Sequence, residues 1–256
     1  MMLRPALTIA AYTLLEALRN RLLWLLLLAA LAGVGLAGFL HELALTEGRE
    51  VQAALLAAAL RLAAVFLVAT FVVTSVVREA DDKGLDMLLA LPMPRAAYLF
   101  GKLAGFAALA LLPALLFGTL SLLFAAPAQS ALWGLSLLCE LWIVAAFSLL
   151  CALSFSQALP ALAGVAGFYL LARVIGALQL LGHGQGGARS HGQRAIGAGL
   201  DLVAAVLPAL DRYTRTEWLL YGSGDAATLL AIAAHSAIYL ALLAAAALFD
   251  LYRKSL

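Results

Sequence analysis

The chain has 256 residues, of which 65% are hydrophobic and only 12% are charged, and its mean hydropathy is +1.04. Soluble domains contain about 45–50% apolar and about 25% charged residues, so this composition excludes a soluble protein and predicts an integral membrane protein. A net charge of +2 without a basic stripe does not favour nucleic acid as a partner.

The N-terminal residues 3–21 are predicted to form an amphipathic helix that lies along the membrane surface. Leu3, Leu7 and Leu14 recur at helical spacing, and Arg4 and Glu16 fall on the opposite side. Because the segment lacks the small-residue cleavage site of a removable signal, the first span is expected to remain as an anchor.

Six apolar runs follow that are long enough to cross a membrane. Only the fifth connection is long, and it is polar. The pattern predicts an all-α, polytopic membrane protein with six transmembrane helices in a single domain, residues 1–256. The predicted spans are 22–40, 52–77, 97–124, 131–153, 159–181 and 226–249.

The distribution of Lys and Arg predicts the orientation of these spans. With both termini inside, nine Lys and Arg residues flank the spans on the inner side and five on the outer side. Positive residues are enriched in short cytoplasmic loops, so the N- and C-termini are both expected to be cytoplasmic.

The longest charged stretch between two spans is the interval 78–102, READDKGLDMLLALPMPRAAYLFGK. The charged residues at its start are expected to be solvated. Leucines such as Leu85 and Leu88 give a short helix an apolar face, and Pro92 ends it. Such a helix either docks a partner or rests on the lipid headgroups.

This interval resembles the first cytoplasmic loop of ABC-2 type (type V) exporter permeases. More narrowly, it resembles the permeases of nitrous-oxide reductase and multicopper-enzyme maturation. The resemblance rests on the Arg-Glu pair, the acidic residues, a Gly, Leu-Leu, Pro92, Arg95, Tyr98 and Gly101-Lys102. One departure is Lys83-Gly84, where many members have Gly-Thr.

The resemblance implies that residues 78–96 form a cytoplasmic coupling helix, which sits in a cleft of a separate ABC ATP-binding subunit. It also implies a multi-pass protein of the bacterial inner membrane that pairs with a second permease copy, expected to form a homodimer. Membrane lipid and a possible periplasmic accessory protein complete the expected partners. The expected docking residues are Arg78, Glu79, Asp82, Lys83, Leu85, Leu88, Leu89, Pro92 and Arg95.

The sequence contains no phosphate-binding loop of the form G-x-x-x-x-G-K-[ST], since Gly101-Lys102 is followed by Leu103. The chain is therefore expected to bind no cofactor and to be no enzyme, with ATP and Mg²⁺ held by the partner subunit. His183 and His191 stand alone in a Gly-rich stretch, so no metal site is predicted.

Three ionisable residues, Arg61, Glu140 and Arg173, fall inside the predicted spans. Charges in the membrane interior are costly unless they are paired or hydrated. The sequence therefore predicts a cluster in which Glu140 meets Arg61 or Arg173. Two interpretations remain open, a structural ion pair and a polar patch that lines a transport pathway.

The long polar segment 182–225 is expected to lie outside the membrane on the extracytoplasmic side. Its residues 195–207 show helical spacing and end at Pro208, which predicts a helix at the outer interface. This helix either gates or accepts a substrate, or simply packs over the spans.

The function predicted from these features is a permease subunit that couples ATP hydrolysis by a separate subunit to export of a substrate. The alternative is a mechanical transmitter that uses the same coupling to act on a periplasmic partner without moving a solute.

Overall fold

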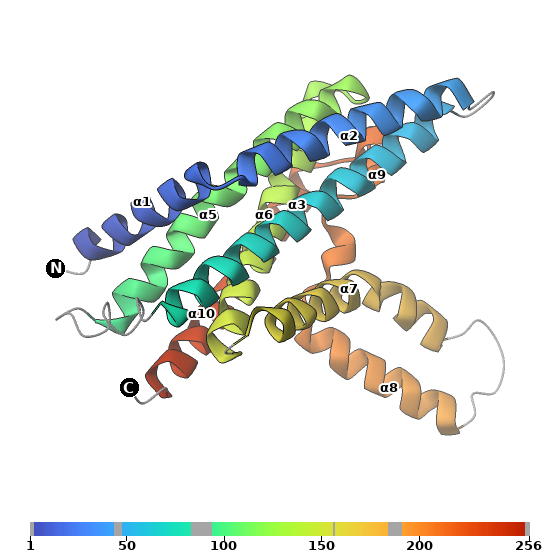
Figure 1. Cartoon of the computed structure of the whole chain (residues 1–256). Helices are drawn as coiled ribbons and strands as arrows, with labels where there is room; N and C mark the ends of the chain where they lie inside the picture. The colour runs from blue at the N-terminus through green and yellow to red at the C-terminus, as the bar shows by residue number, and fades with distance from the viewer. Residues whose placement is uncertain (1–2, 44–47, 83–93, 156, 184–190, 254–256) are drawn as a thin grey trace.

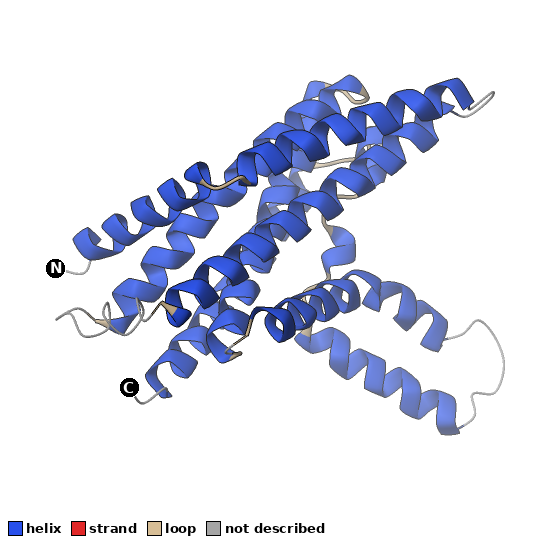
Figure 2. Cartoon of the chain, viewed as in Figure 1, coloured by secondary structure: helices blue, strands red, loops and turns tan. Residues whose placement is uncertain are grey.

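The computed structural model describes residues 3–43, 48–82, 94–155, 157–183 and 191–253. Helices account for nearly all of this part of the chain, and it contains no strand (Figure 2). The α-helices are α1 Leu3–Arg19, α2 Leu22–Leu43, α3 Gly48–Asp81, α5 Arg95–Leu120, α6 Pro127–Ser154, α7 Ala158–His183, α8 His191–Val206, α9 Thr216–Tyr221 and α10 Ala226–Arg253. Two 3₁₀ turns, η1 Ser121–Leu123 and η2 Leu210–Arg212, join them.

Five of these helices are long and apolar enough to cross a membrane, namely α3, α5, α6, α7 and α10. The pair α1 and α2, bent by 55° between them, passes the same test as one broken span. The predicted all-α, polytopic membrane fold is thus confirmed, and six spans are reached when the bent pair counts as one.

Helix α6 lies at the centre of the bundle and contacts α3, α5, α7 and α10. Its most apolar stretch is 78% buried, against 11% in α10, so α6 is the core helix and α10 a peripheral one. It begins at Pro127, four residues before the predicted start, because proline suits the first turn of a helix, where its missing N–H costs nothing.

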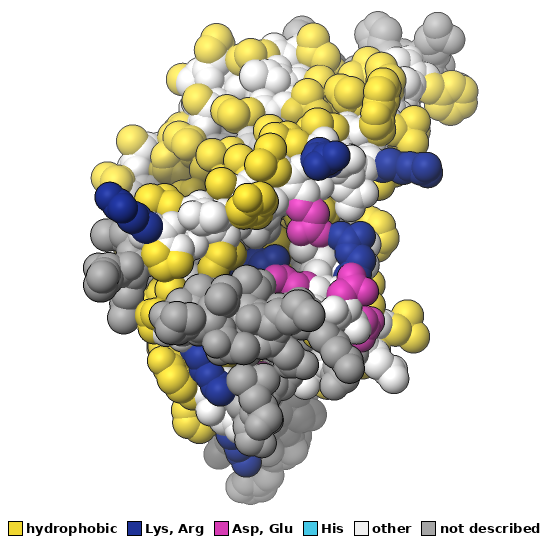
Figure 3. All heavy atoms as spheres, turned by 60° about the vertical axis from the view of Figure 1, so that its left-hand side comes forward, with side chains coloured by type: hydrophobic (Ala, Val, Ile, Leu, Met, Phe, Trp, Pro, Cys, Tyr) yellow, Lys and Arg dark blue, Asp and Glu magenta, His cyan; other side chains and the backbone are white. Residues whose placement is uncertain are grey.

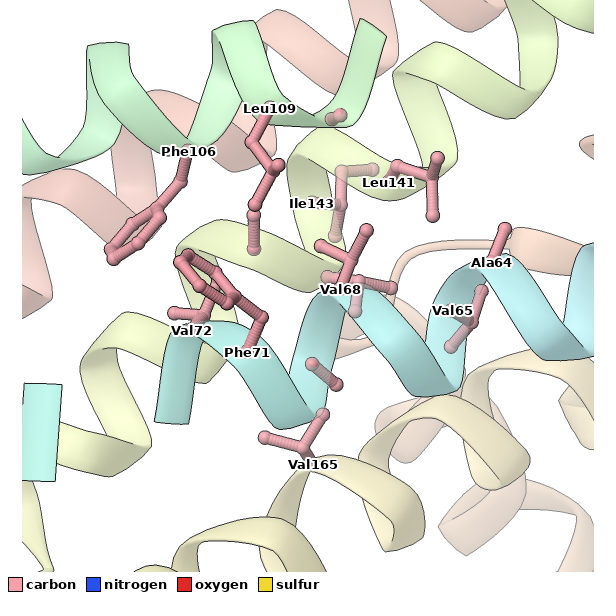
Figure 4. Packing of buried hydrophobic residues seen from close by; sticks show 14 of the residues in the cluster. Ala64, Val65, Val68, Phe71, Val72, Phe106, Leu109, Leu141, Ile143 and Val165 are labelled. Carbon is pink, nitrogen blue, oxygen red and sulfur yellow. The ribbon is translucent and has the colours of Figure 1, made fainter. Parts of the chain in front are cut away.

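The core is made of aliphatic and aromatic side chains where α3, α5 and α6 face one another (Figure 4). Phe71 of α3 meets Phe106 of α5 edge to face, with 6.3 Å between the ring centroids. Leu141 and Ile143 contribute from α6, and Val165 from α7. These contacts hold the two helices that flank residues 83–93 against the central helix.

Helix α1 packs on the first half of α5, and much of its predicted apolar face points away from the bundle. Leu7 and Leu15 are exposed, whereas Thr13 and Ala17 are buried. A Cβ added at Gly105 would lie 2.7 Å from Thr13 Cβ. The contact is therefore a close approach of small residues, which leaves the leucines for the surroundings of the bundle.

Helices α7 and α8 lie side by side and extend away from the other helices (Figure 1). Gln179 Nε2 donates a hydrogen bond of 3.0 Å to Asp201 Oδ1 between them. Helix α9 ends at Gly222, whose φ of 63° is a conformation that glycine adopts at little cost.

Candidate functional site

Both ends of the interval 78–102 belong to spans. Residues 78–81 form the last turn of α3, and residues 95–102 form the first two turns of α5. Tyr98 and Lys102 are buried. The expected third span, 97–124, is confirmed with a start at Arg95. Tyr98 and Lys102 find a polar partner inside the bundle.

The Glu79 carboxylate is the polar partner of both side chains. Lys102 Nζ lies 2.6 Å from Glu79 Oε2, and the Tyr98 hydroxyl donates to the same oxygen at 3.2 Å. The Lys102 side chain is 6% exposed and that of Glu79 is 18% exposed. Since an ammonium withdrawn from water needs a partner, Glu79 is not the solvated residue that the sequence predicted, and it joins α3 to α5.

A second carboxylate, that of Glu16, connects α1 to the end of α3. Glu16 accepts hydrogen bonds from Ser75 Oγ at 3.0 Å and from the Arg78 guanidinium. Helices α1, α3 and α5 are thus linked by one set of polar contacts, called here the loop-end cluster. Its members are Glu16, Ser75, Arg78, Glu79, Tyr98 and Lys102.

A cavity of about 420 Å³ opens among the side chains of the loop-end cluster, and Asp82 and Tyr12 also line it. Asp82 is exposed. Figure 3 shows acidic and basic side chains gathered at this end of the molecule, below a surface that is largely apolar. This is the end where the described part of α3 stops and α5 begins.

Arg95 ties the start of α5 to the end of α10. Its Nη1 donates a hydrogen bond of 2.8 Å to the Leu251 carbonyl oxygen, and its guanidinium carbon lies 5.9 Å from the centroid of the Tyr252 ring. The C-terminal helix therefore ends beside the residues that flank 83–93.

The nine expected docking residues divide into two groups. Arg78, Glu79 and Arg95 make the contacts given above within the chain, and Asp82 faces the cavity. The other five lie outside the described residues, and their docking role stays a prediction. They are Lys83, Leu85, Leu88, Leu89 and Pro92.

Glu140 forms a second polar centre near the middle of α6, where it is completely buried. Its Oε2 accepts a hydrogen bond of 2.7 Å from Thr214 Oγ1, and its Oε1 accepts one of 3.0 Å from the Tyr169 hydroxyl. Arg173 Nη1 lies 3.6 Å from Oε1. The structure thus brings Glu140 together with Arg173.

The two arginines hold the backbone of residues 210–214. Arg173 Nη1 donates to the Leu210 carbonyl and, at 3.0 Å, to the Tyr213 carbonyl. Arg61 Nη1 donates to the Thr214 carbonyl at 3.4 Å. Glu140, Tyr169, Arg173, Arg61 and Thr214 are called here the Glu140 network.

Part of the segment 182–225 packs into the bundle, and its extracytoplasmic location stays a prediction. Leu210, Tyr213 and Thr214 are buried, and Thr214 reaches a carboxylate near the middle of α6. Its backbone N–H is satisfied by Ser136 Oγ at 3.0 Å. A turn can enter a bundle in this way because side chains replace the water that its polar groups would otherwise bind.

Sequence reasoning missed Lys102, Tyr98, Tyr169 and Thr214 as partners of the charged residues. Spacing gives a signal for three of them. Tyr98 and Lys102 are four apart on α5, and Tyr169 precedes Arg173 by four on α7, so each pair shares a helix face. Thr214 carries no such signal, because the turn that delivers it is irregular.

Metal binding has no structural support in the described part of the chain, which contains no group of three side chains able to hold a metal ion. His183 ends α7 and His191 begins α8. Their side chains lie outside what the structure describes, so the expectation of no metal there stays a prediction.

Residues 17–178 match the family model described as ABC-2 family transporter protein. The match runs from the end of α1 to within the last turns of α7 and includes Arg61, Glu140 and Arg173. No curated protein matches the chain.

Proposed function

This chain belongs to the ABC-2 family of transporter proteins, and we propose that it is the transmembrane permease subunit of an exporter driven by a separate ATP-binding subunit. In this proposal the protein spans the bacterial inner membrane with both termini in the cytoplasm. ATP and Mg²⁺ are bound and ATP is hydrolysed by the partner, since the sequence has no phosphate-binding loop.

The observation that carries the proposal is the family match, which includes residues 83–93 and the helices on both sides of them. The loop-end cluster adds physical support. Because Glu16, Glu79 and Lys102 join α1, α3 and α5, a force applied to 83–93 moves three helices together. Such rigid-body movement is what coupling to a motor subunit requires.

The contacts that Glu79 and Arg95 make within the chain change the roles expected of the docking residues. Glu79 and Arg95 act as positioning residues, because their side chains already hold helices of this chain. Asp82, which is exposed, makes direct contact with the partner together with Lys83, Leu85, Leu88 and Leu89. Pro92 ends the docking helix.

The membrane assembly contains two permease copies, and we propose a homodimer. Helices α7 and α10 are only 28% and 11% buried over their most apolar stretches. Lipid covers part of these surfaces, and a second copy covers the rest.

A second candidate function is a mechanical transmitter that acts on a periplasmic accessory protein. The Glu140 network supports it, because Arg61, Arg173 and Glu140 connect the turn 210–214 to α3, α7 and α6. Movement of α3 is therefore passed to the segment that contains α8 and α9, whether or not a solute moves.

The test is co-purification of the full chain with its ATP-binding partner, followed by ATPase assays in lipid vesicles. Asp82→Arg should weaken association and lower ATPase turnover, and Asp225→Arg is the matched control, since Asp225 is exposed just before α10 begins. Equal behaviour of the two variants would contradict docking at this end.

Accumulation and cross-linking measurements in the same vesicles distinguish the two functions. Accumulation of a solute or lipid on the far side supports the exporter. ATP-dependent cross-linking of α8 or α9 to a periplasmic protein, without accumulation, supports the transmitter.

A further inference from the structure

A groove between α5 and α6 lies at the end of the bundle where α5 stops and α6 starts. Its volume is about 480 Å³, within the range of about 300–1,000 Å³ that is typical of sites for small molecules. Its walls are almost entirely apolar, and they include Leu111, Ala114, Leu115, Gly118, Gly134 and Leu135.

Two glycines determine the shape of this groove. A Cβ added at Gly118 would lie 3.3 Å from the Gly134 Cα, and a Cβ at Gly134 would meet the same close contact in return. The two backbones therefore nearly touch at this level, and the larger side chains on both sides form the walls. The depth comes from this close crossing, so the groove is part of the packing of α5 on α6.

Among the residues that the structure describes, two polar side chains line the groove, Thr119 and Ser130. The Thr119 hydroxyl already donates to the Leu116 carbonyl oxygen at 2.8 Å. The Ser130 side chain is buried, with the residue 2% exposed, and its Oγ has no hydrogen-bond partner among the described residues. An unpaired buried hydroxyl is costly, so the Ser130 hydroxyl gains a hydrogen bond when its side chain rotates toward an acceptor held in the groove.

The position of Ser130 along the membrane normal indicates what kind of acceptor is available. Helix α6 has 28 residues and is therefore about 42 Å long, which exceeds the ~30 Å hydrocarbon core of a bilayer. If α6 is centred, its first turn lies at the level of the headgroups, and Ser130 belongs to that turn. Ester carbonyl groups of phospholipids lie at this level, and their acyl chains run inward along the apolar walls.

We propose that this groove is a binding site for a phospholipid, whose acyl chain lies along α5 and α6 and whose ester carbonyl accepts a hydrogen bond from the Ser130 hydroxyl. The site does not depend on the proposed function of the chain. It also differs from a second apolar groove of about 460 Å³ among α5, α6 and α10. There the polar side-chain atom of the lining, Trp142 Nε1, already donates to the Ala107 carbonyl at 3.2 Å.

The second groove supplies a matched control. Ala131 is exposed and lines the first groove, and Ala241 is exposed and lines the second. The full chain is purified with native lipids, exchanged into detergent and analysed by native mass spectrometry. The wild type and Ala241→Trp should retain a bound phospholipid, and Ala131→Trp should lose it. Equal retention by the two tryptophan variants would overturn the proposal.

The hydrogen bond is tested at Ser130 itself. Ser130→Ala should lower lipid retention about two- to tenfold, as expected for loss of one neutral hydrogen bond. Ser130→Thr keeps a hydroxyl and should retain the lipid. Loss of lipid from both variants, or from neither, would contradict the role of the hydroxyl.

A photo-reactive residue identifies the occupant directly. When it replaces Leu135 in the groove and is activated in detergent, it should form an adduct with the mass of a phospholipid. The same residue in place of the exposed Leu170 of α7 should form none. An adduct with a second copy of the chain would overturn the proposal, because the groove would then be a protein interface. Adducts of equal yield at the two positions would also overturn it, since they would indicate ordinary surrounding lipid.

Discussion

The loop-end cluster and the Glu140 network are built from the same chemical parts. Each has a carboxylate that accepts a hydrogen bond from a tyrosine, Tyr98 at 3.2 Å in the first and Tyr169 at 3.0 Å in the second. Each also has a cation beside that carboxylate, Lys102 at 2.6 Å and Arg173 at 3.6 Å.

Their surroundings differ. The loop-end cluster borders a cavity beside exposed residues at one end of the bundle, whereas Glu140 is completely buried in the central helix. The first joins α1, α3 and α5, and the second draws an irregular turn against α3, α6 and α7. Under the proposed function, the first cluster receives a force at the membrane surface, and the second fixes the segment to which the movement is passed.

The largest effect is expected from Glu140→Ala. It leaves the Arg173 guanidinium without its carboxylate inside the bundle, which should cost about 3–5 kcal/mol of folding stability. The measurement is thermal unfolding of the purified protein in detergent. Glu217→Ala, which removes an exposed acid on α9, is the control and should leave the unfolding temperature unchanged.

Glu140→Gln distinguishes a structural network from a transport pathway, because the amide oxygen can still accept a hydrogen bond from Thr214 or Tyr169. Loss of transport with normal assembly would assign Glu140 to a pathway. Loss of folding would make the network purely structural.

A smaller effect is expected from Lys102→Met, which leaves Glu79 partly buried without its ammonium and should cost about 1.5–3 kcal/mol. The double variant Glu79→Gln, Lys102→Met removes both charges and should regain part of this loss. ATPase turnover of the complex should fall in the single variant. If the two changes proved additive in unfolding experiments, the pair would contribute no coupling between α3 and α5.

Gly105→Ala tests the contact of α1 with α5 by sterics alone. The new methyl group would lie 2.7 Å from Thr13 Cβ, and overpacking of this kind should cost about 1–2 kcal/mol. Gly167→Ala is the matched control, because nothing lies within 4 Å of its added Cβ. Equal unfolding temperatures for the two variants would show that α1 is not held closely against α5.

The smallest effect is expected from Arg78→Ala. The Arg78 side chain is 59% exposed, and exposed ion pairs contribute about 1 kcal/mol or less. The unfolding temperature should fall only slightly, and the fall should shrink further at high salt. A loss as large as that of Lys102→Met would mean that the loop-end cluster depends on Glu16 as much as on Glu79.

The sequence predicted the helical class and the position of the apolar helices because long apolar runs have few alternatives in a membrane. It placed Glu140 beside an arginine for the same energetic reason. It could not place Lys102, since a charge near the end of a span is compatible with either solvent or a buried partner. It could not foresee the turn at Thr214, whose burial depends on side chains from α3, α6 and α7.

The sequence predicted that α1 is amphipathic, but it could not show which residues of α1 contact the other helices. Leu7 and Leu15 of the predicted apolar face are exposed, and in a membrane such residues can face lipid. The contact with α5 is made where Ile9 lies against Gly101 and Thr13 lies against Gly105, because small residues allow two helices to approach closely.

We propose that a nucleotide-hydrolysing subunit docks where α3 ends and α5 begins. The most direct test of this docking is cysteine cross-linking in native membranes, with Asp82→Cys at this end and Asp225→Cys beside α10. Cys139 and Cys151 are buried, which limits background reaction. The account predicts a cross-link from position 82 to the ATP-binding subunit and none from position 225. A cross-link from 225 alone would contradict it.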